Sequence, residues 1–290
     1  MSSLSWNAVG PPSLPPVEGL HAKMNAILKH IAGSERLIDV RPASRLEVCP
    51  RPEMLATGIS ALDELTGGLP RGRLTEICGA ASSGKTTVLV TALAAATRRH
   101  ENCVLIDASD SFDPSSAAKA GMDFSKLLWV RCGTSLDAPA SSGLKTKTLN
   151  PRDPRGTQKK TIGEHRLEQV LKATDLVLQS GGFGLVALDL AGIPQKFVRR
   201  IPLASWFRFQ RAVEPTKTAL LVVSEFQCAQ TCATLALKLA ALSHQPSRKP
   251  THTQVFEGMR VETELLRSRL KRKPMQSVKA VFESKAVSAG

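Results

Sequence analysis

The chain has 290 residues, of which 42% are hydrophobic and 22% charged, and its formal net charge is +14. This composition excludes a disordered chain and allows one core of roughly 200 residues with appendages. No apolar run reaches the ~18–20 residues of a membrane span, and the first residues lack the basic and apolar parts of a secretion signal. We therefore expect a cytoplasmic protein with no membrane association.

The chain-order pattern predicts four regions. Residues 1–20 are rich in Pro, Ser and Gly and predict a flexible N-terminal arm. Residues 21–54 contain a short amphipathic helix at 21–31 and a linker. Residues 55–245 form the expected core, interrupted at 135–160 by a mobile basic loop, and residues 246–290 form basic C-terminal strands and a tail.

Within the core, short apolar strands alternate with amphipathic helices. The spacing predicts helices over 85–99 and 164–179, and strands over 74–78, 103–106, 127–131, 183–190 and 218–223. Such alternation is typical of a mainly parallel sheet with helices on both faces. The predicted fold class is therefore α/β.

A glycine-rich motif lies between the first of these strands and the first helix. Residues 79–86 fit G-x-x-x-x-G-K-[ST] at every fixed position, as Gly79, Ala80, Ala81, Ser82, Ser83, Gly84, Lys85 and Thr86, with Thr87 next. A strand, a glycine turn and a helix N-terminus aim backbone N–H groups at phosphates. Lys85 is expected to reach the β and γ phosphates and Thr86 to ligate Mg²⁺, so the cofactors expected are ATP and Mg²⁺.

A second side chain that holds Mg²⁺ is expected at the carboxyl end of another buried strand. The apolar run over 183–188 ends at Asp189, where ligands of open α/β sheets bind. Asp189 is the Walker B candidate, and the alternative is that it caps the N-terminus of a helix.

The six cysteines have no paired zinc-site spacing and are interpreted as reduced core thiols, including Cys228 and Cys232 at i, i+4.

The stretch TGISALDELTGGLPRGRLTEICGAASSGKTT resembles the RecA family, and the similarity continues through CVLIDASDSFDPSSAAKAGMDFSKLLW. This resemblance implies a RecA-like ATPase core over roughly 55–240. In the family, a catalytic glutamate follows the second strand, but Ser109 stands at that place here. A serine cannot act as the carboxylate base that positions water, so we expect weak or absent DNA-dependent hydrolysis, with Asp110 and Glu225 as substitute candidates.

A later stretch, LDLAGIPQKFVRRIPLASWFRFQRAVEP, resembles the ImuA-type RecA paralogues of the SOS mutagenesis cassette. That resemblance implies a role in translesion DNA synthesis with polymerase subunits, or with RecA, as partners. Arg267 and Arg269 occupy the places of two family lysines that reach the γ phosphate of a neighbouring subunit, which implies a trans contact in a homo-oligomer. The alternative for these two arginines is a basic edge strand.

Basic residues are concentrated in three segments. Residues 194–211 hold five basic side chains and no acid, 265–279 hold six and no acid, and 135–160 hold six against two acids. Clustered Lys and Arg are typical of a polyanionic partner, here single-stranded DNA, although solvated surface charge is the alternative. The DNA-binding candidates are Arg199, Arg200, Arg208 and Arg211, and the neighbouring Trp206, Phe207 and Phe209 either stack on bases or face the core.

Three functions remain open on this basis. The first is a RecA paralogue that binds ATP and DNA in DNA repair and the DNA-damage (SOS) response, assisting error-prone translesion synthesis. The second is a DNA-dependent ATPase and recombinase acting in homologous recombination. The third is a protein scaffold that does not hydrolyse nucleotide. Ser109 argues against the recombinase, whereas the complete P-loop and Asp189 argue against the scaffold.

Overall fold

The computed structural model describes residues 22–23, 26–27, 51–132, 162–242, 258–270 and 278–285. The chain divides into two units, Met1–Pro50 and Arg51–Gly290. In the first unit, the described residues of the predicted 21–31 helix are helical, and the rest of that helix lies outside the described residues. The predicted mobile loop at 135–160 also lies outside them. None of the described helices is long and apolar enough to cross a membrane.

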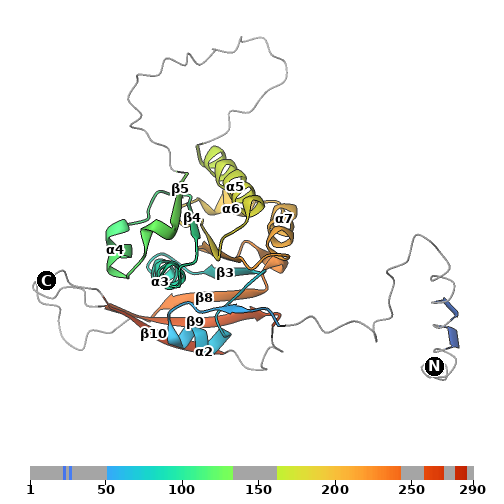
Figure 1. Cartoon of the computed structure of the whole chain (residues 1–290), viewed down its shortest axis with the longest axis horizontal. Coiled ribbons are helices and arrows are strands. Elements are labelled where there is room, and N and C mark those ends of the chain that lie inside the picture. Colours follow the sequence, from blue (N-terminus) through green and yellow to red (C-terminus); the bar gives the residue numbers. More distant parts are fainter. Residues whose placement is uncertain are drawn as a thin grey trace, which may run out of the picture. The chain divides into compact units, whose positions relative to one another are not determined.

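The second unit is built on one twisted sheet of eight strands in the order β10-β9-β8-β3-β7-β6-β4-β5 (Figure 1). The first six strands in chain order are parallel, and they comprise β3 (Leu74–Cys78), β4 (Cys103–Asp107), β5 (Leu127–Arg131), β6 (Leu185–Asp189), β7 (Ala219–Ser224) and β8 (Leu235–Ala241). The antiparallel strands β9 (Gly258–Ser268) and β10 (Lys279–Lys285) extend the sheet beyond β8. The mostly parallel sheet confirms the predicted α/β class.

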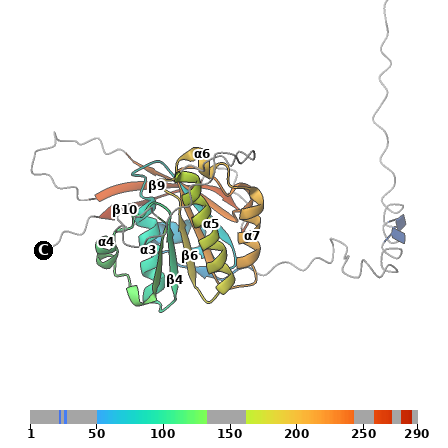
Figure 2. The same cartoon turned by 90° about the horizontal axis from the view of Figure 1, so that it is seen from above.

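Helices cover both faces of the parallel part, and the views in Figures 1 and 2 place α3 (Lys85–Arg98) across the sheet from three other helices. Those helices are α5 (Ile162–Ser180), α6 (Gln195–Val198) and α7 (Leu203–Val213). Alternate residues of each central strand enter one of two hydrophobic cores, since side chains alternate across a strand. Burial on both faces explains why these strands are continuous apolar runs.

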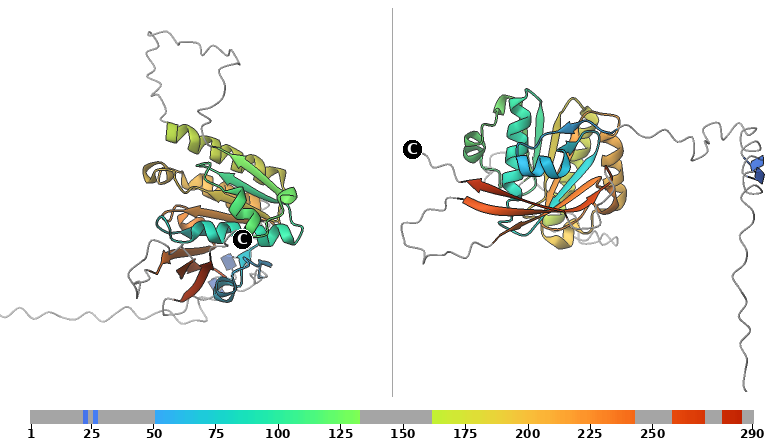
Figure 3. Two further views of the ribbon diagram at one scale, coloured as in Figure 1. Left: turned by 90° about the vertical axis from the view of Figure 1, so that its left-hand side faces the viewer. Right: turned by 90° about the horizontal axis from the view of Figure 1, so that it is seen from below.

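Several short elements complete the unit. They are the two-stranded β1 (Met54–Leu55) and β2 (Leu69–Pro70), α2 (Ser60–Thr66), α4 (Pro114–Lys119) and the 3-10 turns η3 (Phe124–Lys126) and η4 (Gln230–Cys232). Helix α2 lies against β10, as Figure 3 shows. Helix α4 begins because the Asp113 carboxylate accepts the N–H groups of Ser115 and Ser116 and Pro114 fixes the first turn.

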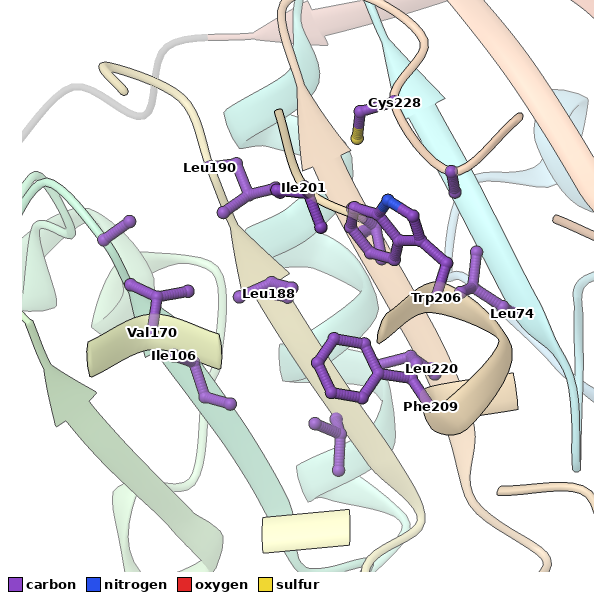
Figure 4. Packing of buried hydrophobic residues seen from close by; sticks show 14 of the residues in the cluster. Leu74, Ile106, Val170, Leu188, Leu190, Ile201, Trp206, Phe209, Leu220 and Cys228 are labelled. Atoms are coloured by element: carbon purple, nitrogen blue, oxygen red, sulfur yellow. The ribbon is translucent and has the colours of Figure 1, made fainter. Parts of the chain in front are cut away.

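Helix α7 resolves the two interpretations of its aromatic residues. Trp206 and Phe209 are completely buried and meet edge to face, with ring centroids 5.9 Å apart (Figure 4). Phe207, between them, is 45% exposed. Trp206 and Phe209 therefore belong to the core and are not available to stack on bases.

This burial gives a stability prediction. Trp206→Phe removes ring volume from a packed core, so we expect the free energy of unfolding to fall by about 1–3 kcal/mol in urea denaturation. Phe207→Leu is the matched control, and its effect should stay within about 0.5 kcal/mol because the side chain is half exposed. Equal effects of the two substitutions would contradict the assignment of Trp206 to the core.

Candidate nucleotide-binding site

The glycine-rich loop connects β3 to α3 at the carboxyl edge of the parallel strands. Gly84 precedes α3 with a φ of 87°, in the left-handed region that favours glycine. A Cβ at Gly79 would collide with the Leu239 carbonyl oxygen of β8, and one at Gly84 would collide with Val261 of β9. Close packing therefore requires both glycines, and the turn also requires Gly84.

Lys85 lies at the centre of this loop. The side chain is buried, and its ammonium donates hydrogen bonds to the carbonyl oxygens of Gly79 and, at 2.6 Å, of Ala80. Burial lowers the pKa of Lys85, and the carboxylates of Glu225 and Asp189 oppose that shift. The ammonium thus lies inside the curve of the loop with negative charge nearby, where a phosphate would compete for it.

Thr86 and Thr87 follow Lys85 in the first turn of α3. Thr86 is exposed, so its hydroxyl is available to a ligand at this edge of the sheet. The Thr87 hydroxyl lies 3.3 Å from the Ser284 hydroxyl of β10. The two neighbouring threonines therefore face different surroundings, and the assignment of Thr86 to a metal ion stays a prediction.

Asp189 ends β6, two strands from β3, and is buried. Its carboxylate accepts the Ala191 N–H at 2.9 Å, and burial raises its pKa to about 6, with Asp107 adding to the shift and Lys85 opposing it. The nearest following helix, α6, has Pro194 as its N-cap, so Asp189 caps a turn and no helix. Asp107 is its register partner on β4.

The described residues contain no cluster of three or more His, Cys, Asp or Glu side chains able to hold a metal ion. A magnesium ion here would therefore take most of its ligands from phosphates and water, with Thr86 and Asp189 as the protein's contribution. The glycine-rich loop, the buried Lys85 ammonium and the single carboxylate of Asp189 fit a magnesium-bound nucleoside triphosphate.

The described cysteines, Cys78, Cys103, Cys132, Cys228 and Cys232, are buried free thiols.

The segment after β4 holds Ser109 in the position expected for a carboxylate base. Asp107 accepts the N–H groups of Ser109, at 3.1 Å, and Phe112, at 3.0 Å, and so fixes the turn. The Ser109 hydroxyl lies 3.0 Å from that of Ser111. The Ser109 side chain also lies against Gly192, three residues after Asp189, since a Cβ added at Gly192 would be 3.0 Å from the Ser109 Cβ.

The two substitute candidates for the base have different environments. Arg131 of β5 binds Asp110 in bidentate fashion, with both contacts at 2.6 Å, and this hydrogen bonding lowers the pKa of Asp110. Glu225 follows β7, which neighbours the P-loop strand, and its charge acts on Lys85. The structure thus brings Glu225, and not Asp110, into the electrostatic surroundings of Lys85.

The four candidate DNA-binding arginines are not equivalent. Arg208 makes a bidentate ion pair with Asp175 of α5, and Arg200 pairs with Glu164 at 3.4 Å. Arg199 lies with its guanidinium 5.7 Å from the ring centroid of Phe226, and Arg211 is exposed. Arg200 and Arg208 border a cavity of about 510 Å³ between α5, α6 and α7, which contains no P-loop residue in its lining.

Arg267 and Arg269 lie on the antiparallel side of the sheet. Arg267 donates to the Gln230 carbonyl and Arg269 to the Thr231 carbonyl at 2.6 Å, so both hold η4 of their own chain. Arg267 is in register with Ala236 of β8. Their trans contact with a neighbour's nucleotide stays a prediction that needs a second copy of the chain.

Sequence reasoning missed one buried charge beside the site. Glu76 lies within β3, where all five residues are buried, and its Oε1 accepts the N–H groups of Cys228 and Ala229. A single acid inside an otherwise uncharged strand was the available signal. Its partners lie more than 150 residues along the chain, so the local pattern could not identify them.

Comparisons with known proteins agree with this geometry. A family model described as the RecA N-terminal domain matches residues 24–138. Protein RecA of Chlorobaculum tepidum is 47% identical over 78 residues, which cover 26% of this chain and 22% of that protein. Protein RecA of Kineococcus radiotolerans is 33% identical over 145 residues, covering 49% and 32%, and that of Ectopseudomonas oleovorans is 30% identical over 159 residues, covering 54% and 33%.

The matched stretches span about a fifth to a third of these relatives' own length. The family-model match includes the P-loop and the Ser109 segment. The matches to the Kineococcus and Ectopseudomonas proteins extend the similarity over about half of this chain. The described sheet, with the P-loop strand β3 between β7 and β8, is the α/β architecture expected of such a core. The chain is therefore similar to the RecA N-terminal domain over residues 24–138, and its described sheet is consistent with that similarity.

Proposed function

We propose that this protein binds Mg²⁺–ATP and single-stranded DNA and acts in DNA repair and the DNA-damage response. The observation that carries the proposal is the complete P-loop at the carboxyl edge of the sheet, where the buried Lys85 ammonium donates to the Ala80 carbonyl and the carboxylates of Glu225 and Asp189 oppose the lowering of its pKa by burial. Lys85 would bind the β and γ phosphates, while Thr86 and Asp189 would orient Mg²⁺, which neutralises phosphate charge when bound.

Hydrolysis is proposed to be weak. Ser109 has no carboxylate to position an attacking water, and Asp110 is engaged by Arg131. Nucleotide would then act mainly as a conformational switch, and a recombinase that turns ATP over rapidly is the less favoured alternative. Within this proposal, the ImuA-like stretch that includes α6 and α7 supports assistance to error-prone translesion synthesis, with polymerase subunits or RecA as partners.

DNA binding is proposed to depend on charge and not on base reading, because Trp206 and Phe209 are buried. Arg199 and Arg211 are the best-placed candidates, since Arg200 and Arg208 would have to leave Glu164 and Asp175 to bind phosphate. Such exchange lowers the affinity gained per arginine. Arg199 and Arg200 directly follow α6, and Arg208 and Arg211 lie on α7.

The test is the salt dependence of binding to labelled single-stranded DNA, followed by fluorescence anisotropy. Neutralising Arg199 and Arg211 together to Gln should reduce the slope of log affinity against log salt by roughly 1–1.5, at about 0.7 per lost phosphate contact. Lys119→Gln with Lys126→Gln, on and beside α4, is the charge-matched control and should leave the slope unchanged. An equal reduction of the slope in both double variants would show that α6, α7 and the residues between them are not the DNA-binding surface.

A further inference from the structure

The cavity between α5, α6 and α7, called the α5–α7 groove below, has an apolar floor. Its volume of about 510 Å³ lies within the range of ~300–1,000 Å³ that is usual for ligand pockets. Three of its nine lining residues are apolar, namely Leu167, Leu171 and Phe197. Leu167 and Phe197 are buried, and Leu171 packs against the same hydrophobic core. These three side chains therefore form the floor of the groove.

The other six lining residues are charged and neutralise one another. They form three ion pairs, Arg208 with Asp175, Arg200 with Glu164, and Lys172 with Glu168. All three cations of the lining are thus already paired, and a phosphate entering the groove would lose its hydration against an apolar floor. The lining therefore suits an uncharged, apolar group and not a nucleic-acid backbone.

Large apolar side chains are exposed beside the groove. Leu176 of α5 is 68% exposed and follows the lining residue Asp175, and Phe207 of α7 is 45% exposed and precedes the lining residue Arg208. Leu203, also exposed, lies one turn before Phe207 on the same side of α7. Figure 2 shows α5 and α7 side by side, with α6 at one end of the pair. Exposed apolar side chains on both helices next to a cavity are typical of a protein-binding surface.

The charge around the groove is positive on the side of α6 and α7. Residues 194–211 carry five basic and no acidic side chains. Helix α5, on the other side, carries three acidic side chains against two of Lys and Arg. The surface as a whole is therefore positive, and it attracts an acidic partner.

We propose that the α5–α7 groove binds an amphipathic helix of a partner protein, with apolar side chains in the cavity and acidic side chains beside them. A helix fits between two neighbouring helices because its side-chain ridges enter the space between them. The surrounding ion pairs exclude water from the apolar contact, and the acids of the partner meet the cations of residues 194–211. This inference goes beyond the proposed function, since it requires neither nucleotide nor DNA binding by this chain.

The test is a selection from a displayed library of random peptides of about 16 residues, roughly four helical turns. The library is selected on the full-length wild type and counter-selected on Phe207→Ser, which removes an exposed apolar contact without changing charge. Leu128→Ser is the matched control, because Leu128 of β5 is 49% exposed and lies outside the groove. The enriched peptides are synthesised, and their affinities for all three proteins are measured by fluorescence anisotropy.

The enriched peptides should be acidic and should carry apolar residues at helical spacing. They should bind Phe207→Ser at least about tenfold more weakly than the wild type, as expected for an apolar residue at the centre of a contact, and Leu128→Ser within about twofold. Basic peptides, or peptides that bind all three proteins equally, would overturn the inference. A folded wild type that enriches no peptide would overturn it as well.

Two further measurements on Phe207→Ser test other occupants of the groove. Binding of labelled single-stranded DNA and self-association in analytical ultracentrifugation should both equal those of the wild type. Loss of DNA binding in this variant would assign the groove to nucleic acid, and loss of self-association would assign it to a second copy of the chain. Either result would overturn the proposal of an acidic partner helix.

Discussion

Ser109→Glu should raise steady-state phosphate release in the presence of Mg²⁺–ATP by about 10²–10⁴-fold, the usual contribution of a general base. The expectation follows from the position of Ser109 two residues after the end of β4, whose last residue, Asp107, is in register with Asp189 of β6. The Asp107 carboxylate accepts the Ser109 N–H, so the backbone at this position is already fixed. A glutamate there would project its carboxylate from a rigid turn, where it can orient water.

Two matched variants separate this explanation from others. Ser109→Gln has the same size as the glutamate without its charge and should stay at the wild-type rate. Asp110→Asn should also leave the rate unchanged, because Asp110 is paired with Arg131. A wild type that already hydrolyses ATP at rates equal to Ser109→Glu would contradict the account, and loss of that activity in Glu225→Gln would then assign the base to Glu225.

The strands of the core were predictable because their sequences are apolar runs bounded by turn residues. The ranges predicted for β3 and β5 agree with the structure, and α3 and α5 differ from prediction by one or two residues at their ends. The apolar pattern did not predict helix α4, since PSSAAK has no apolar periodicity and only Asp113 and Pro114 signal its start. Strand β8 was also missed.

Long-range pairing accounts for most of what the sequence could not predict at the site. The spacing of Trp206, Phe207 and Phe209 suits either face of a helix, and only packing against the sheet decides it. Asp110 and Glu225 were equal candidates by sequence, but pairing of β4 with β5 brings Arg131 to Asp110. Likewise, the carbonyls that bind Arg267 and Arg269 belong to a turn 37 and 38 residues away.

Lys85→Ala should weaken Mg²⁺–ATP binding by about 10²–10⁴-fold. The ammonium is expected to contact two phosphates, and each charge-assisted hydrogen bond contributes about 1.5–3 kcal/mol, where 1.4 kcal/mol corresponds to tenfold in affinity. Lys85 is the only cation of the loop 79–86, so no side chain within the motif can replace it. Lys172→Ala, at an exposed ion pair on α5, is the matched control and should bind as the wild type does.

Equilibrium titration of a fluorescent ATP analogue with the wild type, Lys85→Ala and Lys172→Ala, each with and without Mg²⁺, tests the central claim most directly. Circular dichroism of all three proteins establishes that they are equally folded. The account predicts Mg²⁺-dependent binding to the wild type and to Lys172→Ala, and loss of that binding in Lys85→Ala. Equal binding by all three folded proteins, or no binding by a folded wild type, would contradict it.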